Sequence, residues 1–227
     1  MSWVAWACGF WLAAAAAAMG VTNAPPRPAQ QLGILTRYGD SARIFDAAVN
    51  LADLERGVGE FVHRTIQNCR REAAARGKSS GSVGSMGGNW LEYAVLVALR
   101  ERRLTPAYWQ AEFRAVPHAF NDVMVWSREH GPVILSCKTS LRERYKQADL
   151  EALALQKTYP DAKYFLITLD EDKAHVARVR RKIATGEVLA LQRIYDETNL
   201  DELFAFLETL TLSAAPPDAL RAGKTVR

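Results

Sequence analysis

The order in which helical and extended segments alternate along the chain limits its fold more than any other feature of the sequence. Apolar residues recur at helical spacing from Trp90 to about Arg102, and short segments rich in β-forming residues follow. The expected strands lie near 109–115, 120–127, 132–138, 163–169 and 188–194, and the expected later helices cover 142–157, 173–185 and 199–210. This order predicts an α/β core in which helices flank a central mixed sheet.

Four regions are expected along the 227 residues, a length that suits one domain with an appendage. In chain order they are an apolar N-terminal segment with a proline-rich linker (1–35), a helical N-terminal region (36–80), the core (81–212) and a disordered tail (213–227). The helical region should break near Gly57–Gly59. Residues 77–88 hold five glycines and four serines, which is typical of a flexible loop. Pro216–Pro217 favour disorder in the tail.

The N-terminal segment permits three interpretations. Residues 3–19 are uncharged and apolar, and the first charged residue is Arg27. Seventeen such residues are at the lower edge for a membrane span, and the positive region of a signal peptide is missing. A start codon placed too early, a buried or frayed helix, and a true export or anchor segment all remain open. The rest of the chain argues against export.

Composition excludes several classes of protein. The three cysteines, Cys8, Cys69 and Cys137, are widely spaced, so they form neither a disulfide framework nor a C-x-x-C motif. This usage favours a reducing cytoplasm, and no membrane partner is expected. The four histidines never fall at zinc spacing, so no zinc site is expected. The net charge of +4 permits a polyanionic partner without requiring one.

A lysine and two carboxylates fall where the expected elements could bring them together. Asp122 lies near the start of one strand, Lys138 ends the next strand, and Glu151 lies in the following helix. Side chains alternate along a strand, so Ser136 and Lys138 share a face. Two carboxylates beside a lysine can hold Mg²⁺ and orient a water molecule. The same residues are also commonplace on protein surfaces, and spacing alone does not decide between the two interpretations.

The stretch SCKTSLRERYKQADLE resembles the catalytic region of the PD-(D/E)XK nuclease superfamily. More closely, it is similar to the branch of type II restriction endonucleases that includes EcoRII-like enzymes cutting CCGG or CCNGG cores. In that branch, the acid two residues before the lysine is replaced by a glutamate from the next helix, at the spacing K-x₁₂-E. Ser136 stands at the vacated position here, and Lys138 and Glu151 complete the pattern. Asp122 matches the metal-binding aspartate, although Asn121 precedes it instead of proline.

This resemblance is most specific over residues 120–170 and extends over 89–210. It implies a restriction-endonuclease-like α/β/α core with Asp122 and Glu151 as Mg²⁺ ligands and Lys138 as the group that orients the water and neutralises charge. It also suggests an active-site role for Glu92, which lies in the apolar helix NWLEYAVLVAL. The alternative for Glu92 is a helix-start carboxylate that interacts favourably with the helix dipole.

The charged residues Arg142, Glu143 and Arg144 are the candidates for reading DNA sequence. Arginine can donate two hydrogen bonds to guanine, and glutamate can accept one from cytosine, so the cluster suits G·C pairs in the major groove. A solvated turn that contacts only phosphates is the alternative. The resemblance favours base reading, because members of the branch use an R-(D/E)-R motif here for a CC:GG half-site.

The sequence therefore predicts a Mg²⁺-dependent type II restriction endonuclease that cuts double-stranded DNA at a short palindromic CC/GG-containing site, as part of a restriction-modification system. A palindrome read by one compact domain implies a two-fold homodimer. A catalytically inactive DNA-binding relative is the main alternative, because Ser136 leaves the site without its second acid unless Glu151 reaches it. A membrane-anchored protein of another role is the more distant alternative, suggested only by residues 3–19.

Overall fold

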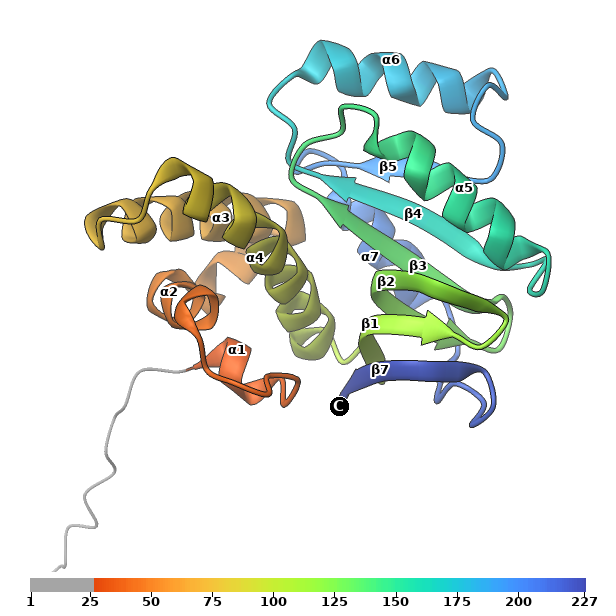
Figure 1. The fold of residues 1–227 in the computed structure, drawn as a ribbon, viewed down its shortest axis with the longest axis horizontal. Helices are drawn as coiled ribbons and strands as arrows, with labels where there is room; N and C mark the ends of the chain where they lie inside the picture. The colour runs from red at the N-terminus through yellow and green to blue at the C-terminus, as the bar shows by residue number, and fades with distance from the viewer. Residues whose placement is uncertain (1–26) are drawn as a thin grey trace, which may run out of the picture.

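The computed structural model describes residues 27–227, which form a three-layered α/β structure around one sheet (Figure 1). The apolar segment 3–19 and the first part of the expected linker lie outside the described residues. The helices on the N-terminal side are α1 (Pro28–Gln31), α2 (Asp40–Ala48), the 3₁₀ helix η1 (Leu51–Arg56), α3 (Val58–Ala75) and α4 (Ser80–Glu101). Three further helices follow among the strands: α5 (Arg144–Gln156), α6 (Lys173–Ala184) and α7 (Leu200–Glu208).

The central sheet is mixed, as the sequence predicts. Its strands are β1 (Ala107–Phe113), β2 (Val116–Ser127), β3 (Gly131–Lys138), β4 (Lys163–Thr168), β5 (Arg193–Tyr195), β6 (Leu212–Ser213) and β7 (Leu220–Val226). They lie in the order β5-β4-β3-β2-β1-β7, and β6 pairs with β2. Strands β3, β4 and β5 are parallel, whereas β7, β1, β2 and β3 pair antiparallel. Helix α5 makes the crossover between parallel β3 and β4, which a strand pair of this kind requires.

Alternate side chains of the strands enter two separate apolar cores, one on each face of the sheet. Val133 and Leu135 of β3 pack with α1 to α4 and α7, whereas Ile134 packs with α5 and α6. The two-residue period of a strand produces this division. The predicted α/β fold with helices on both faces is confirmed.

The glycine- and serine-rich stretch is helical from Ser80 onward, where a flexible loop was expected. Ser79 caps the helix, since its side chain accepts a hydrogen bond from the Ser82 amide at 3.3 Å. Glycine weakens a helix interior by about 1 kcal/mol relative to alanine. Val83 and Met86 pack against the core on the α4 side of the sheet and offset this cost. The buried helix Trp90–Leu99 therefore extends about three turns toward its N-terminus.

Two segments expected to lack structure are packed into the fold. The part of the expected linker that the structure describes contains α1, with Ala29 buried and its amide donating to the Asp46 carboxylate at 2.7 Å. The tail 213–227, expected to be disordered, supplies β7, an edge strand antiparallel to β1. Val226 is fully buried there. Proline composition did not indicate the long-range contacts that order these segments.

The expected break in the helical region agrees with the structure. The break expected near Gly57–Gly59 separates η1 from α3. Gly57 adopts a φ of 114°, a value that residues other than glycine rarely adopt. None of the helices formed by residues 27–227 combines the length and apolar character that crossing a membrane requires.

Candidate active site

Strands β2 and β3 bring Asp122 and Lys138 together at one end of the sheet. Their antiparallel register pairs Val123 with Leu135, so Asp122 lies beside the last residues of β3. The Lys138 ammonium forms an ion pair with Asp122 Oδ2 at 2.7 Å, and both side chains are largely buried. This contact agrees with the expectation from the sequence that Asp122 and Lys138 lie together.

The Asp122 carboxylate uses its two oxygens differently. Oδ2 accepts hydrogen bonds from Ser136 Oγ at 3.2 Å, from the Cys137 amide at 2.8 Å and from Lys138 Nζ at 2.7 Å. Oδ1 accepts none from residues 27–227. The end of β3 therefore fixes the carboxylate through Oδ2 and leaves Oδ1 able to bind another group.

Glu151 lies on α5, which packs over the face of the sheet that carries Ser136. Tyr164 Oη, from β4, donates to Glu151 Oε2 at 2.7 Å. Gln147, one turn earlier on α5, donates to Oε1 at 2.8 Å. An ionised carboxylate offers about four acceptor positions, so each Glu151 oxygen keeps acceptor capacity. Burial, followed by the charge and the hydrogen bond of Glu151, holds the pKa of Tyr164 well above its usual range, so its hydroxyl remains a donor.

Lys138 is the one basic group among these acids in the described part of the chain. Burial acts to lower the pKa of Lys138, but the charge and hydrogen bond of Asp122, with a further contribution from Glu151, raise it above its usual value. Lys138 is therefore a stable ammonium group. Because the charges of Asp122 and Glu151 both raise the pKa of Lys138, the three side chains interact electrostatically.

Glu92 is buried in the middle of α4 and faces the same site. Its Oε2 accepts hydrogen bonds from Trp109 Nε1 at 2.5 Å and Gln110 Nε2 at 2.9 Å. Burial first, and then the Asp122 charge, raise the pKa of Glu92 to about 7, while these two hydrogen bonds and Lys138 act in the opposite direction. The helix begins at Ser80. The alternative of a helix-start carboxylate is therefore wrong, because Glu92 lies more than three turns from the helix N-terminus.

The predicted recognition residues form an exposed turn at the start of α5. Arg142, Glu143 and Arg144 are all exposed, and Glu143 forms an ion pair with Lys146 at 2.5 Å. The guanidinium groups of Arg142 and Arg144 form no ion pair with any side chain in the described range 27–227. Two cationic side chains are thus left available at the exposed start of α5.

The β4–α6 connection and the first turn of α6 contact this turn. Asp170 Oδ2 accepts from the Leu141 amide at 2.6 Å, and the His175 ring contacts the Arg142 carbonyl oxygen at 3.1 Å. Arg142 has a φ of 37°, which is uncommon for a residue with a side chain and is sustained only by surrounding contacts. Sequence reasoning did not identify Asp170 or His175, because both lie about 30 residues beyond the turn that they contact.

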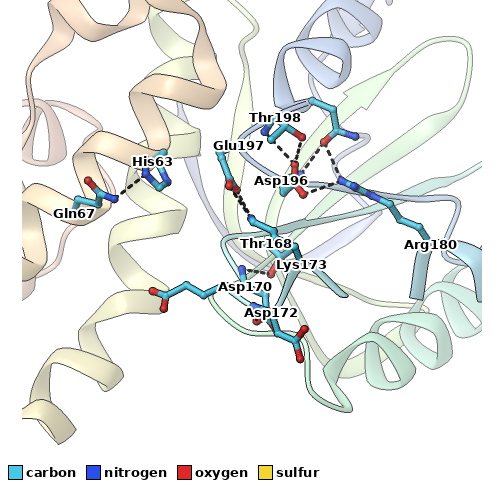
Figure 2. A network of polar contacts seen from close by, with 12 residues as sticks. His63, Gln67, Thr168, Asp170, Asp172, Lys173, Arg180, Asp196, Glu197 and Thr198 are labelled. Carbon is cyan, nitrogen blue, oxygen red and sulfur yellow. Dashed lines mark hydrogen bonds and ion pairs between the residues drawn. The ribbon is translucent and has the colours of Figure 1, made fainter. Parts of the chain in front are cut away.

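A cleft of about 250 Å³, lined by charged and apolar side chains, lies between α3 and the β4–α6 connection, and none of the predicted site residues lines it. His63 and Gln67 lie on α3, with Lys173 and Glu197 on the other side (Figure 2). Lys173 pairs with Glu197 at 2.7 Å, and Arg70 of the cleft likewise pairs with a glutamate at 2.9 Å. Because its charges compensate one another, the cleft has no evident preference for a charged ligand.

Comparison with known proteins supports the fold. No protein-family model and no curated protein matches the sequence. Among solved structures, the chain is similar to the restriction endonuclease PspGI in complex with substrate DNA, with 11% identity, a TM-score of 0.50, and coverage of 75% of this chain and 94% of that one.

Two further similarities are weaker. The type IIP restriction endonuclease Kpn2I is 12% identical, with a TM-score of 0.42 and coverage of 74% of this chain and 70% of that one. Metal-depleted Ecl18kI in complex with uncleaved DNA is 13% identical, with a TM-score of 0.38 and coverage of 74% and 60%. The similarity to PspGI shows that the chain has a restriction-endonuclease-like fold.

Proposed function

We propose that this chain is a Mg²⁺-dependent type II restriction endonuclease that cuts double-stranded DNA at a short palindromic site containing CC/GG. One observation carries the proposal: on a restriction-endonuclease-like fold, Lys138 pairs with Asp122 while Tyr164 donates a hydrogen bond to Glu151 on the same face of the sheet. Fold alone does not imply function, so the proposal rests on these residues.

The acidic residues have the chemistry that Mg²⁺ requires. Among residues 27–227, no three His, Cys, Asp or Glu side chains lie close enough together to enclose a metal ion. Mg²⁺, however, usually keeps several waters and binds through one or two carboxylates together with substrate phosphates. Asp122 Oδ1 and the remaining acceptor positions of Glu151 provide such oxygens. Burial, and after it the charge of Asp122, disfavours the ionised form of Glu92, so a cation bound beside Asp122 would favour ionisation of Glu92.

Each residue then has a distinct part in phosphodiester hydrolysis. When bound, Mg²⁺ would supply Lewis-acid stabilisation of phosphate charge and a lower pKa for a water molecule. The Lys138 ammonium orients the attacking water and neutralises the charge that develops on the phosphate. Asp122 keeps Lys138 protonated and in place. Glu92, with a pKa of about 7, can hold or release a proton at its carboxylate near neutral pH.

We assign DNA sequence recognition to the exposed turn at the start of α5. Arg142 and Arg144 present free guanidinium groups for guanine, and Glu143 offers a carboxylate for cytosine. Two such turns related by two-fold symmetry would read the two halves of a palindrome, so we propose that the active form is a homodimer.

Plasmid cleavage by the purified full-length protein in Mg²⁺ tests this function. Wild-type protein should give discrete fragments whose ends map to one short sequence, whereas Lys138→Ala and Glu151→Ala should lower the rate by at least about a hundredfold, the scale of a lost electrostatic contributor. Lys157→Ala and Glu187→Ala, which change exposed residues of the same types, are the matched controls.

Two other results would contradict the proposal. Specific DNA binding by folded wild-type protein without cleavage in Mg²⁺ or Mn²⁺ would identify a catalytically inactive DNA-binding relative. Neither binding nor cleavage would mean that the fold serves another function.

A further inference from the structure

Tyr164 connects the helix that carries Glu151 to the sheet that carries the rest of the candidate site. It lies in β4 with 1% of its surface exposed, among the residues that pack against α5. Its hydroxyl donates to Glu151 Oε2 at 2.7 Å. Parallel pairing places Tyr164 opposite Ile134 and Leu166 opposite Ser136, so the phenol lies on the same face of the sheet as Ser136.

The other hydrogen bond to Glu151 gives a weaker constraint. Gln147 is exposed and lies on α5 itself, one turn before Glu151, so it moves with the helix. Among residues 27–227, two side chains donate hydrogen bonds to Glu151. Tyr164 is the one that belongs to the sheet. It therefore fixes the carboxylate relative to Asp122 and Lys138 as well as relative to α5.

We infer that Tyr164 is a positioning residue that holds the Glu151 carboxylate where Mg²⁺ binds, in place of the acid that Ser136 does not supply. The inference rests on the proposed function. A glutamate on a helix has three rotatable side-chain bonds, and a fixed donor removes much of that freedom before the metal arrives. Hydrogen bonds of this kind to metal ligands typically contribute ten- to a hundredfold to metal affinity.

Tyr164→Phe isolates this role because it removes the hydroxyl and keeps the buried ring. Tyr108→Phe is the matched control: Tyr108 is also buried on the α5 side of the sheet, and its hydroxyl accepts a hydrogen bond from the Ala215 amide at 2.9 Å, with no contact to Glu151. Thermal unfolding of both variants shows whether each retains the fold.

Mn²⁺ binding to the full-length protein without DNA, measured from the electron paramagnetic resonance signal of free Mn²⁺, is the direct readout. We expect the dissociation constant to rise about tenfold in Tyr164→Phe, the lower end of the range for such partners, and to stay unchanged in Tyr108→Phe. In a Glu151→Ala background, Tyr164→Phe should have no further effect, because a positioning residue acts through its partner.

The outcomes separate this inference from the proposed function. If wild-type protein binds Mn²⁺ but does not cut DNA, and Tyr164→Phe weakens binding, the inference holds and the nuclease proposal fails. Equal Mn²⁺ affinity in Tyr164→Phe and wild type overturns the inference. The inference also fails if Tyr164→Phe weakens Mn²⁺ binding in the Glu151→Ala background as much as it does in the wild type. Absence of Mn²⁺ binding by wild type overturns both the inference and the metal assignment.

Discussion

Glu92 should make the stability of the folded protein depend on pH in a direction opposite to that of most paired acids. Its side chain is 6% exposed, and burial with the Asp122 charge raises its pKa from 4.5 to about 7. Replacing it by glutamine keeps the shape and removes the titration. In Glu92→Gln, the side-chain oxygen can still accept the hydrogen bonds from Trp109 and Gln110 that now reach Oε2.

The size of the effect is set by the difference between the two pKa values. Below pH 4.5 the carboxyl is protonated in both the folded and the unfolded state. Between 4.5 and about 7 the folded state keeps the proton while the unfolded state has lost it, so the folded state becomes progressively less stable as pH rises. Above pH 7 the cost is complete and amounts to about 3 kcal/mol, as an order of magnitude.

Urea unfolding at several pH values, without added metal, measures this cost. The free energy of unfolding of Glu92→Gln minus that of the wild type should increase by about 2–3 kcal/mol between about pH 5 and pH 8. Taking the difference cancels the titrating groups that do not interact with Glu92, which behave alike in both proteins. Glu187→Gln, a change at an exposed glutamate, should show no such trend. A difference for Glu92→Gln that is constant across this range would refute the assignment of a raised pKa to Glu92.

Two further predictions concern side chains that form hydrogen bonds to the backbone of another segment. Asp201 of α7 accepts hydrogen bonds from the Val58 and Gly59 amides at 2.7 and 3.1 Å, so Asp201→Ala should lower the free energy of unfolding by about 1 kcal/mol in urea, as for a lost helix cap. His175 contacts the Arg142 carbonyl oxygen at 3.1 Å, so His175→Ala should reduce the preference for the cognate DNA over a site with one altered base pair by about tenfold, measured by competition binding, with a smaller loss of cognate affinity. Unchanged discrimination would show that the turn does not need this support.

The sequence was sufficient to predict the contact between Asp122 and Lys138. Both residues belong to neighbouring strands joined by a short turn, so local pattern determines their register. The sequence placed Glu92 on its helix but not at its correct distance from the helix N-terminus. The glycine-rich composition of residues 80–88 predicted a loop where the first turns of α4 lie. Its partners Trp109 and Gln110 belong to β1, and no local pattern links that strand to α4.

The C-terminal strand shows a different reason for failure. The segment LRAGKTV of β7 contains an arginine, a glycine and a lysine, and its order comes from hydrogen bonding to β1, more than a hundred residues earlier in the chain. Edge strands are commonly polar because one side faces solvent. Composition therefore identifies such a strand as a tail, whereas the unpaired edge of β1 determines its actual structure.

The position of Glu151 differs in kind from that of an acid carried by β3. An acidic residue at position 136 of β3 would be positioned by the backbone hydrogen bonds of the sheet, which also position Asp122 and Lys138. A residue on α5 depends instead on how the helix packs, through Ala148 and Ala152, and on the Tyr164 hydroxyl. Both determinants lie outside the pattern formed by the aspartate, the lysine and the glutamate. Chains that share this pattern can therefore differ in metal binding, and residue 164 is one place where such a difference would arise.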